Sequence, residues 1–441
     1  WDEVFELFSA PSDGSAAPVR LGPALAPGTD VEPGLFFTPD GQAVLYRVHD
    51  PARERTELRI AASATAGVSA RLDDEFSPGG EVVDVVLGPG GQRAFYRADR
   101  ALDELFELFS VRLATPGAPV RLSNPLQVEG PASVAEFFLA PDSGHVVYHA
   151  LLGDDYRMGL HARELRGAGR ERDLTDSAHW IRDVLGFSVD GRIVYTATNA
   201  SSSSAAPTYS APLDGSAPPV VVLESEARHI SPDGRWVAFA DAGNQSTLVS
   251  ARTDGASGEI ALATAGDMES LSLAPDNTHI LFTAADSFLH PFELFSTRLD
   301  GTVTPLRISG AVGSGAGARL AFASPYSPDG TAVLYRADDR VEGREELFIA
   351  SVDGSFPARR LNGTLAANGA DVLRASFTPD GTRVAYAAQQ DGDGQVELYI
   401  VPSDGSLPST RLTSAGFLVL EGTRLSDTHA FFVAGALGQL W

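Results

Sequence analysis

Cysteine and lysine are both absent from the 441 residues of this chain. Without cysteine the protein can form no disulfide, and it offers no thiol nucleophile and no thiolate ligand for zinc. That absence leaves the cellular compartment open. Long apolar runs are missing too: none approaches the roughly 20 residues that a membrane-spanning helix needs, so we expect no membrane insertion.

Basic charge is scarce. The 33 basic residues are all arginines and face 58 Asp and Glu residues, which gives a formal net charge of −25. Nucleic-acid binding depends on a basic surface that neutralises phosphates, so this composition argues against a nucleic-acid partner. An acidic chain favours solubility, cation binding and association with a basic partner.

Helical periodicity and a leader segment are also missing. No stretch keeps an apolar period of 3.6 residues, whereas many short stretches alternate between apolar and polar residues, so the sequence predicts an all-β protein. The chain begins Trp1-Asp2-Glu3 instead of with the basic and apolar segments of a signal peptide. We therefore expect a mature or excised segment.

What the chain does have is a repeated phrase: an apolar residue, a small residue and Pro-Asp-Gly, followed by a Val- and Tyr-rich stretch. Clear copies are 37–41, 230–234, 326–330 and 377–381, and weaker ones are centred on Pro89, Pro141, Val189, Pro275 and Ser426. Successive copies lie 43 to 53 residues apart. Self-similarity at this spacing is typical of repeat architectures.

Each repeat carries four strand signals. In the clearest copy they fall at 372–377, 383–386, 397–400 and 410–412, separated by Pro-Asp-Gly and Asp-Gly turns. Four antiparallel strands per repeat predict a β-propeller with one sheet per blade. The count of copies gives nine blades, with eight as the fallback, in a single domain over 1–441. Residues 438–441 followed by 1–8 resemble 102–109, so we expect N- and C-terminal strands to close the last blade, with Trp1 near Trp441.

The repeat resembles that of TolB-like propellers, which are related to the WD-repeat propellers. The resemblance rests on Phe-Ser/Thr-Pro-Asp-Gly-x-x-Val-x-Tyr, then Glu-Leu-Tyr/Phe, Asp-Gly and Arg-Leu, and it covers nearly the whole chain. It implies a bacterial, extracytoplasmic protein, periplasmic or secreted. Such repeats occur in binding scaffolds and as accessory domains of peptidases, whose catalytic triad lies in a separate α/β domain that this chain has no room for. TolB-like proteins usually have six blades, whereas this chain holds nine copies.

Seven aspartates occupy the repeated phrase, and two interpretations apply to them. They would form a ring of metal ligands, or they would each stabilise a local turn by bonding to their own following backbone. We favour the turn interpretation. The seven are Asp40, Asp142, Asp190, Asp233, Asp276, Asp329 and Asp380.

The two faces of the predicted propeller differ. One carries the regular Pro-Asp-Gly and Asp-Gly turns, whereas the other carries links and connectors that vary in length and composition. Binding residues concentrate on loops held by a rigid scaffold, so the variable face is the predicted recognition surface. Its acidic loop residues are Asp154, Asp155, Asp338 and Asp339, for which a solvated loop charge is the plainer interpretation.

A second candidate site lies at the mouth of the predicted central channel, where the innermost strand of each blade begins. The charged residues there are Glu32, Asp84, Glu136, Asp183, Glu269, Arg374 and Glu421. Converging carboxylates suit a hard cation, so calcium is the metal that this set would take, and solvated channel charges are the alternative. We expect no required cofactor. The nine histidines are scattered, and His145 and His149 lie four apart on a predicted strand, which is no helical metal pair.

These features favour a non-catalytic, monomeric propeller that binds a protein or peptide partner across its variable face and channel mouth. One alternative is a lyase or glycan hydrolase at the channel mouth that uses paired carboxylates such as Glu136 and Asp183, with no other catalytic residues indicated. The other alternative is a structural module of a larger surface protein.

Overall fold

A computed structural model of the chain divides into two compact units, residues 1–204 with 211–219 and residues 205–210 with 220–441. That both belong to one domain over 1–441 stays a prediction. The residues that the structure describes are 4–9, 17–73, 80–100, 102, 104–124, 133–142, 144–152, 157–165, 169, 171–175, 179–199, 206–241, 245–287, 291–310, 317–320, 322, 325–338, 344–365, 371–390, 396–412, 417–425 and 430–436.

The first unit opens with the pair β1 (Phe8–Ser9) and β2 (Val19–Arg20). Three sheets follow: β3 (Asp30–Val31), β4 (Phe36–Phe37), β5 (Ala43–Asp50), β6 (Arg55–Ala62) and β7 (Ala70–Arg71); β8 (Val82–Leu87), β9 (Arg93–Ala98), β10 (Glu107–Arg112) and β11 (Val120–Arg121); and β12 (Ser133–Leu139), β13 (His145–Leu152), β14 (Arg157–Glu164) and β15 (Glu171–Asp173). The unit boundary falls within the next sheet, β16 (His179–Ser188), β17 (Arg192–Asn199), β18 (Thr208–Pro212) and β19 (Val220–Leu223).

The second unit holds four further sheets and a final pair. The sheets are β20 (His229–Ile230), β21 (Trp236–Ala240), β22 (Ser246–Arg252) and β23 (Ile260–Ala265); β24 (Asp267–Leu273), β25 (His279–Ala285), β26 (Glu293–Arg298) and β27 (Leu306–Arg307); β28 (Ala318–Arg319), β29 (Ala332–Ala337), β30 (Glu346–Ser351) and β31 (Arg359–Arg360); and β32 (Val372–Phe377), β33 (Arg383–Ala388), β34 (Glu397–Pro402) and β35 (Thr410–Arg411). The pair is β36 (Phe417–Leu425) and β37 (Ala430–Ala436).

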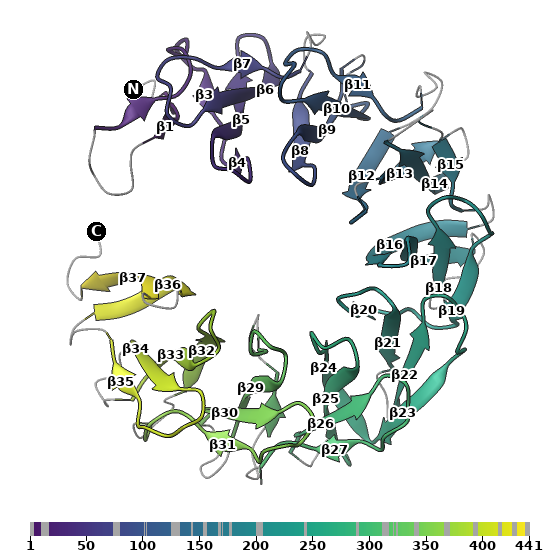
Figure 1. The fold of residues 1–441 in the computed structure, drawn as a ribbon, viewed down its shortest axis with the longest axis vertical. Helices are drawn as coiled ribbons and strands as arrows, with labels where there is room; N and C mark the ends of the chain where they lie inside the picture. Colours follow the sequence, from purple (N-terminus) through teal and green to yellow (C-terminus); the bar gives the residue numbers. More distant parts are fainter. Residues whose placement is uncertain are drawn as a thin grey trace. The chain divides into compact units, whose positions relative to one another are not determined.

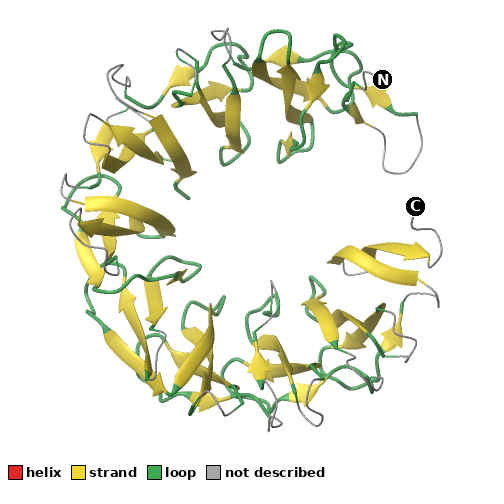
Figure 2. Ribbon diagram, turned by 180° about the vertical axis from the view of Figure 1, so that it is seen from behind, coloured by secondary structure: helices red, strands yellow, loops and turns green. Residues whose placement is uncertain are grey.

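The sheets have the architecture of propeller blades. Their strands are hydrogen-bonded in chain order, and only the β3–β7 sheet departs from four strands, because β3 and β4 share the place of a first strand (Figure 1). The described part of the chain contains strands and loops without a helix, and so no helix long and apolar enough to cross a membrane (Figure 2). These observations confirm the predicted fold class, an all-β propeller of four-stranded antiparallel blades.

The two-stranded pairs near the ends of the chain supply the strands of the ninth predicted blade. Phe8 lies opposite Arg20 in β1 and β2, just as Phe109 lies opposite Arg121 in the third and fourth strands of a complete blade. β36 and β37 supply a first and a second strand. Trp1, Trp441 and the worn turn at Ser426 lie outside the described residues, so their juxtaposition stays a prediction.

An aromatic pair recurs between the second and third strands of the blades. The residues of each pair are register partners, and their ring centroids lie 5.2 to 5.7 Å apart in a stacked arrangement. The tyrosines of these pairs are at most 3% exposed and belong to apolar clusters that join one blade to the next. The core therefore lies between blades, where burial of large side chains stabilises the stack most. The pairs are Tyr96–Phe109, Tyr148–His161, Phe282–Phe295, Tyr335–Phe348 and Tyr386–Tyr399.

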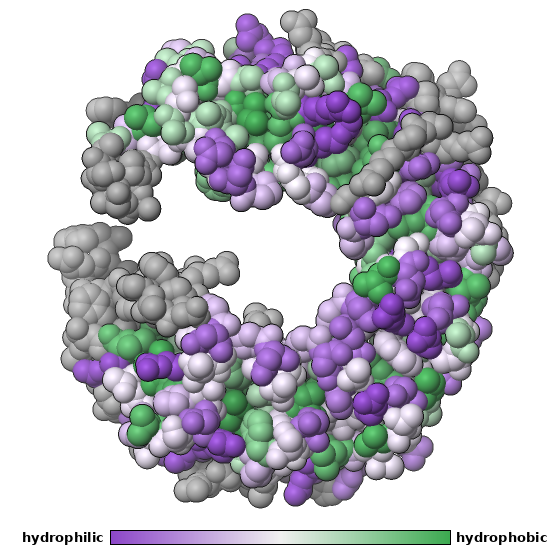
Figure 3. All heavy atoms as spheres, in the orientation of Figure 1, coloured by the Kyte–Doolittle hydropathy of each residue, from purple (hydrophilic) through white to green (hydrophobic). Residues whose placement is uncertain are grey.

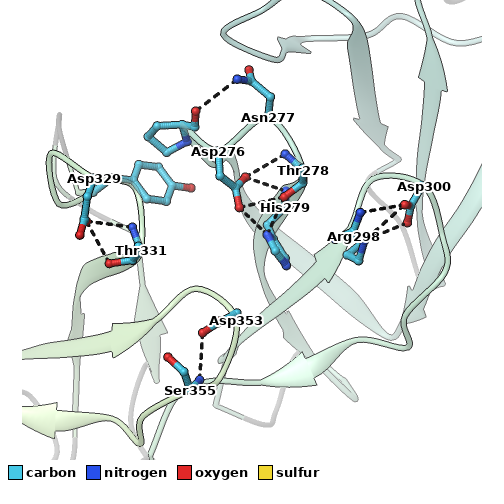
Figure 4. Close-up of polar contacts among 12 residues, drawn as sticks. Asp276, Asn277, Thr278, His279, Arg298, Asp300, Asp329, Thr331, Asp353 and Ser355 are labelled. Carbon is cyan, nitrogen blue, oxygen red and sulfur yellow. Dashed lines mark hydrogen bonds and ion pairs between the residues drawn. The ribbon is translucent and has the colours of Figure 1, made fainter.

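The Pro-Asp-Gly aspartates act in the turns, as predicted. In the turn at 378–383, the Thr378 hydroxyl donates to Asp380 Oδ1 at 2.6 Å, and the Thr382 amide donates to the same oxygen at 3.0 Å. Gly381 has a φ of 71°, a left-handed conformation that glycine adopts without steric cost. Asp329, Asp276 and Asp353 accept hydrogen bonds from the amides two residues on in the same way (Figure 4). Asp300 accepts one from the Thr302 amide. These hydrogen bonds, chiefly from Thr378, hold the pKa of Asp380 below its usual value.

Successive turns also contact one another. A Cβ atom added at Gly91 would lie 2.3 Å from Pro39 Cδ in the preceding blade, and one added at Gly381 would lie 3.2 Å from Pro328 Cδ. The amide of Asp233 donates to Asn277 Oδ1 at 2.8 Å, which links two further turns. The repeated phrase therefore specifies both the turn and its packing against the next turn.

Tyrosine hydroxyls tie each blade to the connector that enters it. The Gly310 amide donates to the Tyr335 hydroxyl at 3.3 Å, and the Gly363 amide donates to the Tyr386 hydroxyl at the same distance. Phe239 and Phe282 take this position in blades whose connectors are short, 224–228 and residue 266 alone. The hydroxyl thus occurs where a long connector needs an anchor.

We predict that Tyr335→Phe lowers the free energy of unfolding by about 1 kcal/mol, because the Gly310 amide loses its acceptor while the ring packing is kept. Urea unfolding followed by tryptophan fluorescence measures the change, and an unaltered near-ultraviolet circular dichroism spectrum serves as the control for the fold. Equal stability of the variant and the parent would contradict the anchoring role.

One buried polar position differs in charge among the blades. The Leu58 amide donates to Asp73 Oδ2 at 2.9 Å. In another blade the Leu347 amide donates to Asn362 Oδ1 at 2.8 Å. Asp73 is 2% exposed, and this burial raises its pKa to about 6 although the Arg71 charge opposes the shift. The neutral residues that serve in other blades are Ser123, Thr175, Ser309 and Asn362.

Folding raises the pKa of Asp73, so the free energy of unfolding falls as the pH rises from about 4 through 6 and the buried carboxyl ionises. We therefore predict that Asp73→Asn unfolds at a higher urea concentration than the parent at pH 8, with a gain of up to about 3 kcal/mol. The gain should vanish below about pH 4, where the aspartate is protonated in both states. A pH-independent difference would show that packing, and not ionisation, sets the effect.

Candidate binding site

Six of the first strands carry β-bulges, and all the charged residues predicted for the channel mouth except Glu32 lie at them. The register shifts between Val134 and Glu136 in β12, and between Ile181 and Asp183 in β16. A bulge turns successive side chains away from the regular alternation and so exposes residues that a flat strand would bury. The predicted residues at bulges are Asp84, Glu136, Asp183, Glu269, Arg374 and Glu421; the first five are exposed, and the side chain of Glu421 lies outside the described part.

Two of the predicted acids are partners of arginines that join neighbouring blades. Arg47 lies 3.1 Å from Glu32 and donates to the Val82 carbonyl at 3.2 Å. Arg97 donates to Asp84 Oδ2 at 2.7 Å and to the Val134 carbonyl, in the next blade, at 2.6 Å. Glu32 and Asp84 therefore neutralise structural arginines.

The remaining predicted charges are not compensated. Among the described residues, Glu136, Asp183, Glu269 and Arg374 make no side-chain hydrogen bond or ion pair. An exposed carboxylate without a protein partner keeps its charge available to a ligand. Of these, Glu136 alone borders a described cavity.

The cavity beside Glu136 has a volume of about 460 Å³ and lies in the first unit. It is bordered by the bulges of β8 and β12 and by β13 and β14, so it combines first-strand residues with residues beside the variable link between β13 and β14. This size is within the range of small-ligand sites in proteins. Its walls are Asp84, Val86, Ala135, Glu136, Phe137, His149 and Met158.

His149 is a residue of this cavity that the sequence presents only as one of nine scattered histidines. It is the register partner of Glu136, and its Nε2 atom is buried without a hydrogen-bond partner in the described structure. Burial, together with the nearby His161, lowers the pKa of His149, so the imidazole is neutral at pH 7. With Asp84 paired to Arg97, Glu136 gives the cavity a net negative charge. Counting outward from the Pro141-Asp142 turn would have placed His149 opposite Glu136.

Of the four acidic loop residues predicted for the variable face, the structure describes Asp338. Asp338 is 2% exposed, so its interpretation as a solvated loop charge is wrong: it directly follows β29 and is buried. Asp154, Asp155 and Asp339 lie outside the described residues. In the described part of the chain no group of three His, Asp or Glu residues could hold a metal ion, and calcium binding stays a prediction.

Mutation should distinguish a charge that stabilises the fold from a charge that has no partner in it. We predict that Arg97→Met lowers the free energy of unfolding by about 2 kcal/mol, because a charged hydrogen bond between two blades is lost. Glu136→Gln, the matched exposed variant, should stay within about 0.5 kcal/mol of the parent. Chemical denaturation at pH 7 measures both, and a large loss for Glu136→Gln would show that its carboxylate is structural.

No family model matches the chain, and no curated protein matches it. Many solved structures resemble it, among them the following three. An oligogalacturonate lyase in complex with manganese matches at 15% identity and a TM-score of 0.37, over 79% of this chain and 96% of the lyase. Dipeptidyl peptidase 4 of Porphyromonas gingivalis matches at 12% and 0.45, over 91% of this chain and 55% of the peptidase. A putative TolB from Agrobacterium tumefaciens matches at 16% and 0.27, over 62% of this chain and 80% of that protein.

At these identities a likeness bears on the fold alone. The propeller assignment stands on the blade topology itself, and membership of the TolB-like family stays a prediction.

Proposed function

We propose that this chain is a non-catalytic propeller that binds a basic segment of a protein or peptide partner at the first-strand bulges and the loops beside them. The observation that carries the proposal is the cavity in which the uncompensated Glu136 lies opposite a neutral His149. An arginine or lysine side chain supplies the charge that Glu136 lacks, and its aliphatic stem suits Val86, Phe137 and Met158.

The charge of the whole chain supports the same partner class. A net charge of −25 raises the local concentration of cationic ligands and speeds their association. Asp183, in the same unit as Glu136, adds an exposed, unpaired carboxylate at the equivalent bulge of the next blade. Two acids at one structural position in successive blades suit a basic segment of a peptide better than a single small ligand.

The proposal includes an extracytoplasmic, bacterial location, which rests on the resemblance of the repeat to TolB-like propellers. It includes no nucleic-acid partner and a monomeric state. Calcium is not required by the binding scheme, and the binding measurements should be made with and without it.

The enzymatic alternative, a lyase or glycan hydrolase acting through Glu136 and Asp183, requires both carboxylates to flank one bond. The described cavity instead brings Glu136 together with Asp84, whose charge is balanced by Arg97. The role of a structural module in a larger surface protein requires no ligand, so it predicts no selective peptide binding.

The binding proposal predicts that a fluorescently labelled arginine-rich peptide binds the chain in an anisotropy titration, whereas a glutamate-rich peptide of equal length does not. Affinity should fall steeply as salt is added, because exposed charges are screened. Glu136→Gln should weaken binding by about tenfold through loss of a charged hydrogen bond.

Glu54→Gln is the matched control, since Glu54 is an exposed acid in the link between β5 and β6 that does not border the cavity. It should change the affinity little. Equal weakening by both variants would reduce the interaction to non-specific charge attraction, and absence of selective binding would overturn the proposal.

A further inference from the structure

A second cavity, of about 460 Å³, lies in the second unit between β23 and the blade β24–β27. Its position follows from two local departures from the repeat. Phe282 stands where Tyr335 and Tyr386 stand in the two following blades, so the hydroxyl that anchors a connector is missing. The connector itself is only Gly266, so this junction has no counterpart of the Gly310 amide that donates to the Tyr335 hydroxyl.

The walls of this cavity are small and apolar. They expose the methyl groups of alanines and two proline rings, and the half-buried ring of Phe295 stacks on Phe282 with 5.5 Å between the centroids. Polar groups come from two acids, Asp286 and Glu293. The lining residues are Ala263, Thr264, Ala265, Phe282, Ala284, Ala285, Asp286, Pro291, Glu293, Phe295 and Pro305.

The two acids differ in whether the carboxylate already has a hydrogen-bond partner. Glu293 accepts a hydrogen bond from Arg307 at 2.6 Å, so its charge is largely compensated. The Asp286 side chain is exposed and makes no hydrogen bond or ion pair among the described residues. Its backbone is held closely by the short connector, since a Cβ added at Gly266 would lie 1.9 Å from the Asp286 carbonyl oxygen. The backbone of Asp286 is therefore held against Gly266, and its carboxylate lies at the edge of an apolar hollow.

We propose that this cavity binds a compact organic ammonium ion with an aromatic body. The apolar walls accept the body, the face of Phe295 attracts the cation, and Asp286 accepts a charged hydrogen bond from the ammonium group. An apolar pocket with a few fixed polar groups is the usual form of a small-ligand site. The inference goes beyond the proposed function and does not depend on it, because the two cavities lie in different units.

Two kinds of ligand carry an ammonium group next to an aromatic ring: a free aromatic amine and a peptide whose amino-terminal residue is phenylalanine. Phenethylamine and a short peptide that begins with phenylalanine are the two probes, titrated by isothermal calorimetry against the full chain at pH 7. Phenylacetate, which has the same body and the opposite charge, is the ligand control. Binding of the amine with none of phenylacetate is the expected result, and the stronger of the two probes identifies the kind of ligand.

Two variants locate the site. Asp286→Asn should weaken amine binding by about tenfold, since the charged acceptor is lost. Ala265→Leu should fill the cavity and abolish binding. Glu259→Gln, which removes an exposed acid from the turn between β22 and β23 outside the cavity, should leave binding unchanged. Thermal melting of each variant shows whether it folds, and the exposed Asp286→Asn keeps the test valid if Ala265→Leu does not.

The proposal is overturned if neither probe binds the folded parent chain. It is equally overturned if phenylacetate binds as well as phenethylamine, or if amine binding is the same in Asp286→Asn and the parent.

Discussion

Burial of the paired aromatic rings between neighbouring blades is the interaction on which the rest of this structure depends. No blade encloses its own core: Tyr96 and Phe109, for example, pack with Leu45, Leu58 and Leu72 of the blade before them. Each sheet is therefore stable only against its neighbour, as expected for repeat proteins. The recurrence of the pair fixes the register of the second and third strands, and through it the positions of the turns on one side and the bulges on the other.

The carboxylates on the two sides of the blades differ in whether they take part in hydrogen bonds of the fold. The Pro-Asp-Gly side uses its carboxylates internally, in hydrogen bonds to Thr378, Thr382 and their equivalents, so those charges are committed to the fold. The bulged side leaves Glu136, Asp183 and Glu269 exposed. Hydrophilic residues are widespread on the surface drawn in Figure 3. An internal hydrogen-bond donor marks a carboxylate as structural, as Figure 4 shows for Asp276 with Thr278 and for Asp329 with Thr331.

Much of this could be predicted from the sequence, because the repeat is written in local signals. Turn chemistry at Asp380 and strand alternation at 372–377 depend on neighbouring residues only, and both were confirmed. Contacts between blades are another matter. That Arg97 reaches the Val134 carbonyl and that Asp338 is buried depend on how the chain packs, and not on neighbouring residues alone. A composition of charged residues does not reveal which of them already have partners.

The central claim is that the uncompensated carboxylate of Glu136 is a recognition group for a basic partner segment. A crystal structure of the chain with a bound arginine-rich peptide tests it most directly. The account predicts a guanidinium group within hydrogen-bond distance of the Glu136 carboxylate, with its stem against Phe137 or Met158. A peptide bound only along the Pro-Asp-Gly turns, with this cavity empty, would contradict it.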